Sequence, residues 1–91
     1  FKVYAQEVEK VLLEHPAVAE AAVIGVPRSI SGEIVKAFVV LKKDEKATSK
    51  ELTEHCKKKL SYYKVPRIID FLSEMPRSSI GEILKRKLEK E

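Results

Sequence analysis

The chain has 91 residues, of which 44% are hydrophobic and 35% are charged, with three Gly and four Pro. This composition is typical of one small ordered domain and excludes a disordered or fibrous chain. Eighteen Lys and Arg against fourteen Asp and Glu give a net charge of +4, which suits an anionic partner such as a phosphate ester, a nucleotide or a nucleic acid.

The single cysteine excludes an internal disulfide framework and a cysteine-rich zinc site. It favours a reducing compartment, so we expect a cytoplasmic protein. No apolar run approaches the roughly 20 residues that a membrane-spanning helix needs, so no transmembrane segment is expected. Because the first residue is Phe, we expect residues 1–91 to form one domain of a longer chain.

The first half of the chain predicts one helix and two strands. Apolar residues at helical spacing predict a helix over 5–14, which Pro16 ends. An almost continuous apolar run predicts a central strand, buried on both faces, over 18–26. β-branched and aromatic residues predict a second strand over 34–41.

The second half predicts a helix, a strand and a final helix. Thr48 followed by Glu51 is a capping box, and it opens a helix whose buried face carries three regularly spaced apolar residues, Leu52, Cys56 and Leu60. A short third strand is expected over 67–72.

Ser79 followed by Glu82 is a second capping box, which predicts a last helix from about Gly81. The sequence therefore predicts an α+β fold of order α-β-β-α-β-α, with a small three-stranded sheet covered by helices.

The residues alone show no complete catalytic site: there is no phosphate-binding glycine loop, no His and Cys pair at metal spacing and no nucleophile elbow. The basic run 57–59 is either a solvated helix face that complements the helix dipole or a clamp for a phosphate ester. The run 85–87 has the same two interpretations. As a carboxylate in the first turn of a helix, Glu82 has a purely structural interpretation.

Several motifs, in the same order and at the same spacing, resemble one known family over nearly all of the chain. They are Phe1-Lys2-Val3-Tyr4, Glu7-Val8-Glu9, the run from His15 to Pro27, Gly32-Glu33 with Ala37 to Leu41, Tyr63-Lys64-Val65-Pro66-Arg67, and the segment from Pro76 to Leu88. In these residues the chain resembles the small C-terminal domain of the AMP-forming acyl-CoA synthetases, within the adenylate-forming superfamily.

The resemblance implies a ligase of fatty acid or other carboxylic acid metabolism. Such an enzyme uses ATP, with Mg²⁺, to convert a carboxylic acid to an acyl-adenylate and pyrophosphate, and then passes the acyl group to CoA with release of AMP. The partner implied is a large N-terminal domain of the same chain, which holds most of the ATP and acid pockets. The small domain closes over that site, rotates between two poses and is not catalytic in isolation.

The resemblance also implies roles for single residues. Phe1, Lys2 and Val3 resemble the end of the loop that lines the pantetheine tunnel, with Lys2 at a position that is often basic and able to contact phosphate. The hinge residue is expected just upstream of Phe1. Lys57 matches a basic position that some relatives use for the CoA nucleotide, and Gly81 matches the glycine of the family's Gly-Lys-Ile motif.

Glu82 departs from the family, which has a lysine after this glycine that reaches the acid and the α-phosphate during adenylation. A carboxylate would oppose the negative charge that builds on the transferring oxygens, so we expect the adenylation step to suffer. Three explanations stay open: Glu82 is an engineered substitution, the natural protein lacks adenylation activity, or Lys85, one turn further on, compensates.

Two other function classes stay open. One is a basic module that binds nucleic acid through residues 57–59 and 85–87; against it, no aromatic residue is clearly interleaved with these lysines, and we expect no nucleic-acid partner. The other is a regulatory or protein-interaction domain derived from the enzyme family, an alternative that Glu82 keeps open. The residues specify neither the acid, nor CoA against a carrier-protein acceptor, nor the oligomeric state, nor a metal ligand.

Overall fold

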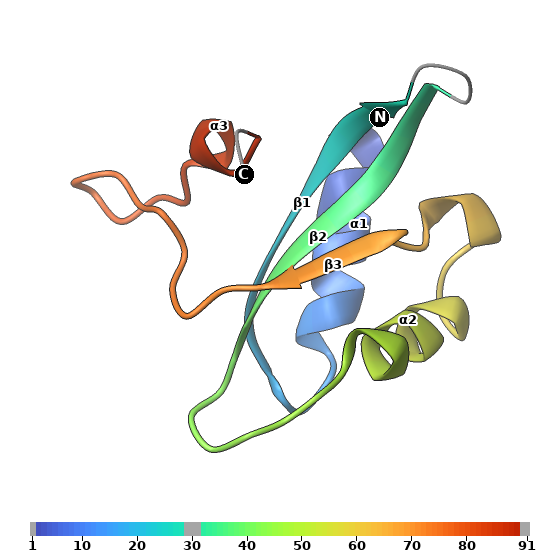
Figure 1. Cartoon of the computed structure of the whole chain (residues 1–91), viewed down its shortest axis with the longest axis horizontal. Coiled ribbons are helices and arrows are strands. Elements are labelled where there is room, and N and C mark those ends of the chain that lie inside the picture. Colours follow the sequence, from blue (N-terminus) through green and yellow to red (C-terminus); the bar gives the residue numbers. More distant parts are fainter. Residues whose placement is uncertain (1, 29–31, 90–91) are drawn as a thin grey trace.

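The structure is a computed structural model that describes residues 2–28 and 32–89. Its elements follow the predicted order, so the α+β prediction is confirmed (Figure 1). They are α1 (Lys2–Leu13), β1 (Val18–Arg28), β2 (Gly32–Leu41), α2 (Ser49–Lys57), the 3₁₀ turn η1 (Tyr62–Lys64), β3 (Ile68–Phe71) and α3 (Lys85–Leu88).

The three strands form one mixed sheet in the order β1-β2-β3. β1 and β2 are antiparallel, in a register that runs from Val18 opposite Leu41 to Arg28 opposite Gly32. β2 and β3 are parallel. Because parallel neighbours cannot be joined by a tight turn, the chain crosses from β2 to β3 through α2 and η1.

The first strand lies at the edge of the sheet and β2 is central, so the prediction that the first strand is central is wrong. It is nevertheless buried on both faces, as predicted: Val23 packs on one face and Ala22 on the other. β1 also continues through Pro27 to Arg28. An edge strand tolerates proline because one row of its backbone groups makes no ladder hydrogen bonds. An apolar run in the sequence therefore predicts that a strand is buried on both faces, but it does not predict whether the strand is central or at the edge of the sheet.

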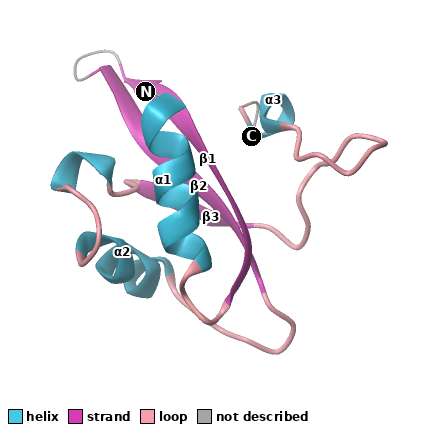
Figure 2. Ribbon diagram, turned by 180° about the vertical axis from the view of Figure 1, so that it is seen from behind, coloured by secondary structure: helices cyan, strands magenta, loops and turns pink. Residues whose placement is uncertain are grey.

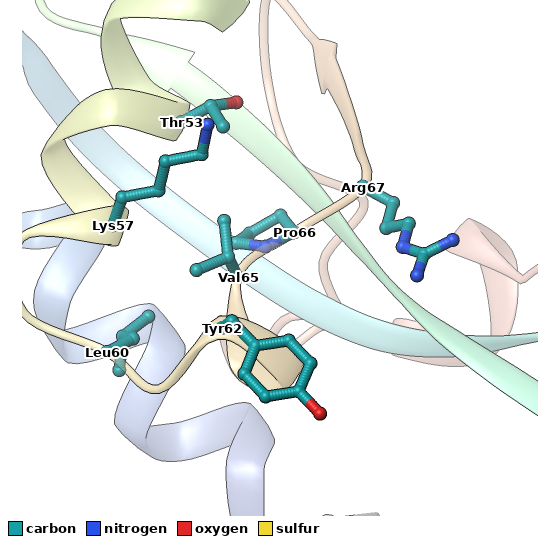
Figure 3. Close-up of a pocket in the computed structure, with 7 residues that line it drawn as sticks. All are labelled: Thr53, Lys57, Leu60, Tyr62, Val65, Pro66 and Arg67. Atoms are coloured by element: carbon teal, nitrogen blue, oxygen red, sulfur yellow. The ribbon is translucent and has the colours of Figure 1, made fainter.

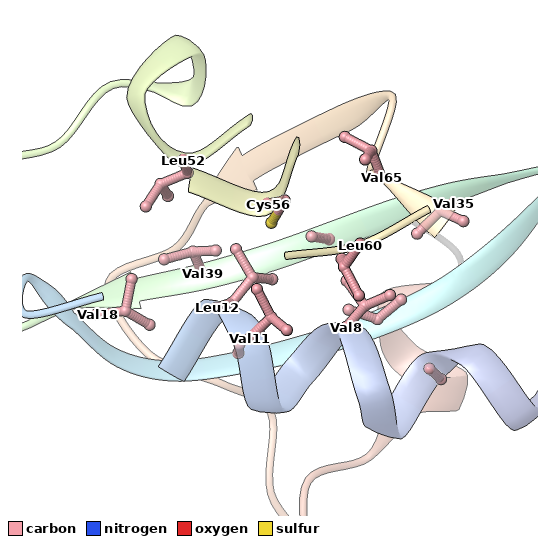
Figure 4. Packing of buried hydrophobic residues seen from close by; sticks show 14 residues of the cluster. Val8, Val11, Leu12, Val18, Val35, Val39, Leu52, Cys56, Leu60 and Val65 are labelled. Carbon is pink, nitrogen blue, oxygen red and sulfur yellow. The ribbon is translucent and has the colours of Figure 1, made fainter. Parts of the chain in front are cut away.

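Helices α1 and α2 cover one face of the sheet (Figure 2), and the larger cluster of buried side chains lies between them and the strands (Figure 4). Leu12 of α1, Leu52 of α2 and Val39 of β2 are fully buried there. Cys56 is also fully buried, which confirms its predicted place in the core. Burial raises the pKa of the Cys56 thiol to about 11, so the thiol stays protonated and unreactive at neutral pH.

The segment 72–89 packs on the opposite face of the sheet. Its side chains Met75 and Leu88 are buried against Phe38 and Ala22 of the strands, and Ile83 packs at the margin of this second cluster. The sheet therefore separates two layers, one made by α1 and α2 and the other by the C-terminal segment.

The last helix begins at Lys85 rather than near Gly81, so the second predicted capping box is wrong. The acceptor in this segment is Ser78 rather than Ser79: the Ser78 Oγ accepts a hydrogen bond from the backbone N–H of Glu82 at 3.2 Å. This bond closes a turn. Gly81 has a φ of +89°, a left-handed conformation that favours glycine and does not continue a right-handed helix.

The first predicted capping box is confirmed, and its removal should destabilise the domain. The Thr48 Oγ1 accepts the backbone N–H of Glu51 at 3.1 Å, and the Glu51 Oε1 accepts the backbone N–H of Thr48 at 3.2 Å. We expect Thr48→Ala to lower the free energy of unfolding by about 1 kcal/mol in urea denaturation, since helix N–H groups lose their partner. Ser49→Ala, one position further on and outside the capping box, is the matched control and should change it by less than about half as much.

Candidate functional site

Residues 76–84 form a short hairpin-like loop, here called the 76–84 loop, between β3 and α3 (Figure 1). Arg77 and Ile83 form an antiparallel bridge across it. The backbone N–H of Leu84 donates to the carbonyl of Pro76 at 2.8 Å. These two contacts join the two ends of the loop, so its tip is held in one conformation.

Arg77 holds both the shape of the loop and its attachment to the sheet. Its Nη1 donates to the carbonyl oxygen of Gly81 at 2.7 Å, and its Nη2 forms an ion pair with Glu20 of β1. Arg77 lies in the segment from Pro76 to Leu88 that carried the resemblance, but it received no role there. Its partner Glu20 lies in a distant part of the sequence, and no local pattern connects the two residues.

The exposed tip of the 76–84 loop carries Gly81 and Glu82, with Ile80 79% exposed beside them. Within the described part of the chain, no side-chain hydrogen bond or ion pair holds the Glu82 carboxylate. Lys85 does not approach it: the Lys85 Nζ lies 2.7 Å from the Glu9 Oε2, so this ammonium is engaged with α1. The side chain at position 82 is therefore free to meet whatever faces the loop.

A pocket of about 430 Å³ lies among α2, η1 and the segment that leads to β3 (Figure 3). This volume falls within the roughly 300–1,000 Å³ that is usual for small-molecule sites. In Figure 3, Lys57 extends from α2 on one side of Val65 and Pro66, and Arg67 extends on the other. The lining residues are Thr53, Lys57, Leu60, Tyr62, Val65, Pro66 and Arg67.

The lining of this pocket favours an anion beside an apolar or aromatic group. It includes two cations, Lys57 and Arg67, and no carboxylate. The Lys57 Nζ lies 3.2 Å from Glu54, but both side chains are more than half exposed, so a stronger anion can replace this weak pair. The backbone N–H of Arg67 donates to the carbonyl of Val35 at 2.9 Å, and this bond fixes the backbone of Arg67 on the sheet.

The 76–84 loop and the pocket lie on opposite sides of the sheet. Leu60 and Val65 line the pocket and belong to the cluster under α1 and α2. Met75, just before the loop, belongs to the cluster on the other face, and Ile83, within the loop, packs against that cluster. One orientation of the domain therefore cannot present Glu82 and Lys57 to the same ligand atoms.

A family model for the AMP-binding enzyme C-terminal domain matches residues 7–82. The chain belongs to this family. It is 50% identical over 91 residues to a long-chain-fatty-acid–CoA ligase of Yersinia pestis and 50% identical over 93 residues to 4-hydroxybutyrate–CoA ligase 1 of Metallosphaera sedula. The crystal structure of a Brucella canis acyl-CoA synthetase superposes with a TM-score of 0.87 at 47% identity, covering 94% of this chain and 16% of that one.

These matches cover this chain almost completely and the relatives only in small part. The alignments include 100% and 99% of this chain but 16% of each of the two ligases. The resemblance that the motifs gave is thereby confirmed, and the alternative of a nucleic-acid-binding or interaction module finds no support among the relatives.

The basic runs of this AMP-binding enzyme C-terminal domain are partly neutralised. Lys59 lies 2.8 Å from Glu14, and this hydrogen bond lowers the pKa of the Glu14 carboxyl. In the other run, Lys85 is paired with Glu9. In the first run, Lys57 lines a pocket, whereas Lys59 forms an ion pair on the surface and has a structural role.

The remaining predicted site residues stay predictions. Phe1 lies outside the described residues, and Lys2 and Val3 form the first turn of α1. Within the parts of the chain that the structure describes, no helix is both long and apolar enough to span a membrane, and no cluster of three or more His, Cys, Asp or Glu is arranged to hold a metal ion.

Sequence reasoning missed two residues that line the pocket beside Lys57. Tyr62 and Arg67 both lie in or next to the Tyr63-Lys64-Val65-Pro66-Arg67 motif, which carried the resemblance but received no role. The motif was the available signal. The sequence does not show that the turn η1 brings this motif alongside α2, where Lys57 lies.

Proposed function

We propose that the chain is the mobile C-terminal domain of an AMP-forming acyl-CoA synthetase, acting with a large N-terminal domain of the same protein. The N-terminal domain holds ATP, its Mg²⁺ and the carboxylic acid. The C-terminal domain closes over them and contributes to CoA binding. The observation that carries this proposal is the pocket in which Lys57 and Arg67 flank an apolar floor.

In this proposal the pocket receives the nucleotide end of CoA. Lys57 and Arg67 supply positive charge for its phosphates, and an arginine adds planar paired donors. Tyr62 is 90% exposed, so its ring is available for a base to stack on. Phe1, Lys2 and Val3 contribute to the pantetheine tunnel, as the resemblance implies.

The two sides of the sheet serve the two half-reactions. In one pose the 76–84 loop enters the N-terminal domain and places position 82 beside the acid and the α-phosphate. In the other pose the CoA pocket faces the same centre. Because the sheet separates the two sites, a rotation of the domain is needed between adenylation and thioester formation. Glu82 weakens the first step and leaves the second intact.

The choice of acid belongs to the N-terminal domain. Two relatives equally identical to this chain are named for different acids, one long-chain and one a short hydroxy acid. The identity of this domain to such relatives therefore does not follow the acid for which they are named. We place the protein in the cytoplasm, since the cysteine of this chain is a free thiol buried in the core.

The thioester step tests this function independently of Glu82. The full-length protein is mixed with CoA and a panel of synthetic acyl-adenylates that includes hexadecanoyl and 4-hydroxybutanoyl adenylates, and acyl-CoA and AMP are measured by chromatography. We expect acyl-CoA from at least one adenylate with the full-length protein and none above background with residues 1–91 alone. No acyl-CoA from any adenylate, or equal activity of the isolated domain, contradicts the proposal.

Lys57→Ala in the full-length protein should weaken CoA binding. We expect the KM for CoA in the thioester step to rise about tenfold, because one charge-assisted contact to phosphate is lost. Lys58→Ala is the matched control: Lys58 is the adjacent exposed lysine and does not line the pocket. Its KM should change by less than about twofold.

The same pair of variants identifies the group that Lys57 contacts. If Lys57 binds the 3′-phosphate, Lys57→Ala should lower the preference for CoA over 3′-dephospho-CoA, and Lys58→Ala should leave it unchanged. An equal preference in both variants means that Lys57 contacts another part of CoA or none.

A further inference from the structure

Lys64 occupies a cage that joins α1 to the pocket. Its Nζ donates to the Glu7 Oε1 at 2.8 Å, and it lies 5.1 Å from the centroid of the Tyr4 ring and 5.7 Å from that of Tyr63. The two tyrosine rings meet edge to face with centroids 5.5 Å apart. We call Tyr4, Glu7, Tyr63 and Lys64 the lysine cage.

The Lys64 side chain is more enclosed than the paired lysines of the basic run 57–59. The Lys64 side chain is 18% exposed, less than the 47% of Lys59 and the 59% of Lys57 in their own ion pairs. The hydrogen bond to Glu7 raises the pKa of Lys64, so the ammonium stays charged through the neutral range. An ammonium between two aromatic faces and a carboxylate is fixed from three sides.

The turn that Lys64 fixes is short, with one backbone bond of ordinary length, from the N–H of Lys64 to the carbonyl of Ser61 at 2.9 Å. η1 is a single 3₁₀ turn whose N-cap, Ser61, makes no side-chain capping bond. Its last backbone bond, from the N–H of Val65 to the carbonyl of Tyr62, is long at 3.4 Å. The Tyr62 ring is almost wholly exposed, and its edge-to-face contact is with the ring of Tyr63, 5.7 Å away between centroids.

These contacts form one chain of packing from α1 to the pocket. Glu7 and Tyr4 hold the Lys64 ammonium, Lys64 and Tyr4 hold Tyr63, and Tyr63 supports Tyr62, which lines the pocket. We propose that Lys64 is a positioning residue for CoA: it fixes Tyr62 and the adjoining wall of the pocket and ties them to the first turns of α1. This inference rests on the proposed function, because it assigns the pocket to the CoA nucleotide.

Three variants of the full-length protein test the role of Lys64 in the thioester step, with the synthetic adenylate that gives the fastest turnover. Lys64→Met keeps the length of the stem and removes the charge. We expect it to raise the KM for CoA about fivefold to tenfold with kcat within about twofold, the pattern of weakened binding rather than weakened chemistry. Lys64→Arg keeps the charge and should recover most of the loss.

Glu7→Gln separates positioning from simple attraction between charges. Removing a carboxylate near an anionic ligand lowers the KM if only the overall charge matters. If the cage positions the pocket, the KM for CoA rises instead, by about threefold, because Lys64 loses its partner. Lys58→Met is the control for loss of one nearby lysine and should change the KM by less than about twofold.

Each outcome is decisive. A KM that rises in Lys64→Met and Glu7→Gln and recovers in Lys64→Arg supports positioning. A Lys64→Met protein that matches Lys58→Met, or a KM that falls in Glu7→Gln, overturns it. If circular dichroism shows that Lys64→Met is unfolded, Glu7→Gln and Lys64→Arg decide alone. If the unmodified protein makes no acyl-CoA from any adenylate, the proposed function itself fails, which is a separate result.

Discussion

Glu82→Lys should raise the rate of adenylation by roughly two or more powers of ten in the full-length protein, the usual value of one well-placed electrostatic donor in a transition state. The substitution is expected to act in the transition state, where negative charge builds on the oxygens between the acid and the α-phosphate. A carboxylate at this position repels that charge, and a lysine attracts it. The measurement is acid-dependent exchange of labelled pyrophosphate into ATP.

The geometry of the 76–84 loop allows this substitution to change the charge at position 82 without changing the fold. Glu82 is exposed, its side chain makes no bond within the described residues, and the turn is held by backbone bonds and by Arg77. A lysine therefore fits without altering the fold. The control is Glu89→Lys, the same exchange at another exposed carboxylate near the C-terminal end of α3, which should leave the rate within about twofold.

The thioester step distinguishes the explanations of Glu82. If Glu82→Lys restores adenylation while the rate from synthetic acyl-adenylate is unchanged, position 82 serves the first step alone. If the unmodified protein already adenylates and the lysine changes little, another residue supplies the charge. Lys85→Met then tests the third explanation. Lys85 is paired with Glu9 at 2.7 Å, so we expect Lys85→Met to leave adenylation unchanged.

The element order of the fold was predictable because periodicity and capping are local. Thr48 and Glu51 form the bonds that their spacing indicates, and Leu52, Cys56 and Leu60 are buried on the face that their spacing defines. The position of β1 was not predictable in the same way. Burial on both faces makes an edge strand and a central strand look alike in sequence, and the pairing partner lies elsewhere in the chain.

The start of α3 shows how a local signal fails when another bond competes with it. Ser79 and Glu82 have the spacing of a capping box, but Arg77 donates to the carbonyl of Gly81 and pairs with Glu20. That long-range pair and the left-handed glycine stabilise a turn in place of the first helical turn. The pocket was not predictable for a related reason, because Lys57 and Arg67 line the same pocket only after the chain has crossed from α2 to β3.

Phe38→Ala should destabilise the domain by about 3–5 kcal/mol, the usual cost of replacing a buried aromatic side chain with alanine. Phe38 is fully buried in the central strand, at the centre of the cluster that holds Met75 and Leu88. Its ring also lies 4.8 Å from the Lys36 ammonium, a contact that is lost with it. A small domain has a total stability of roughly 5–15 kcal/mol, so this one change removes a large share.

The same substitution also tests the link between the core and the 76–84 loop, because the second cluster attaches the C-terminal segment to the sheet. Guanidinium denaturation of the domain, followed by circular dichroism, gives the free energy of unfolding. The matched control is Phe71→Ala at the end of β3, where the ring is 40% exposed and the expected loss is below about 1.5 kcal/mol. Equal losses in the two variants would mean that the C-terminal segment does not pack on Phe38. A much larger loss for Phe38→Ala is the expected result. If Phe38→Ala also slows adenylation when it is added to the full-length Glu82→Lys protein, this cluster holds the loop in its working position.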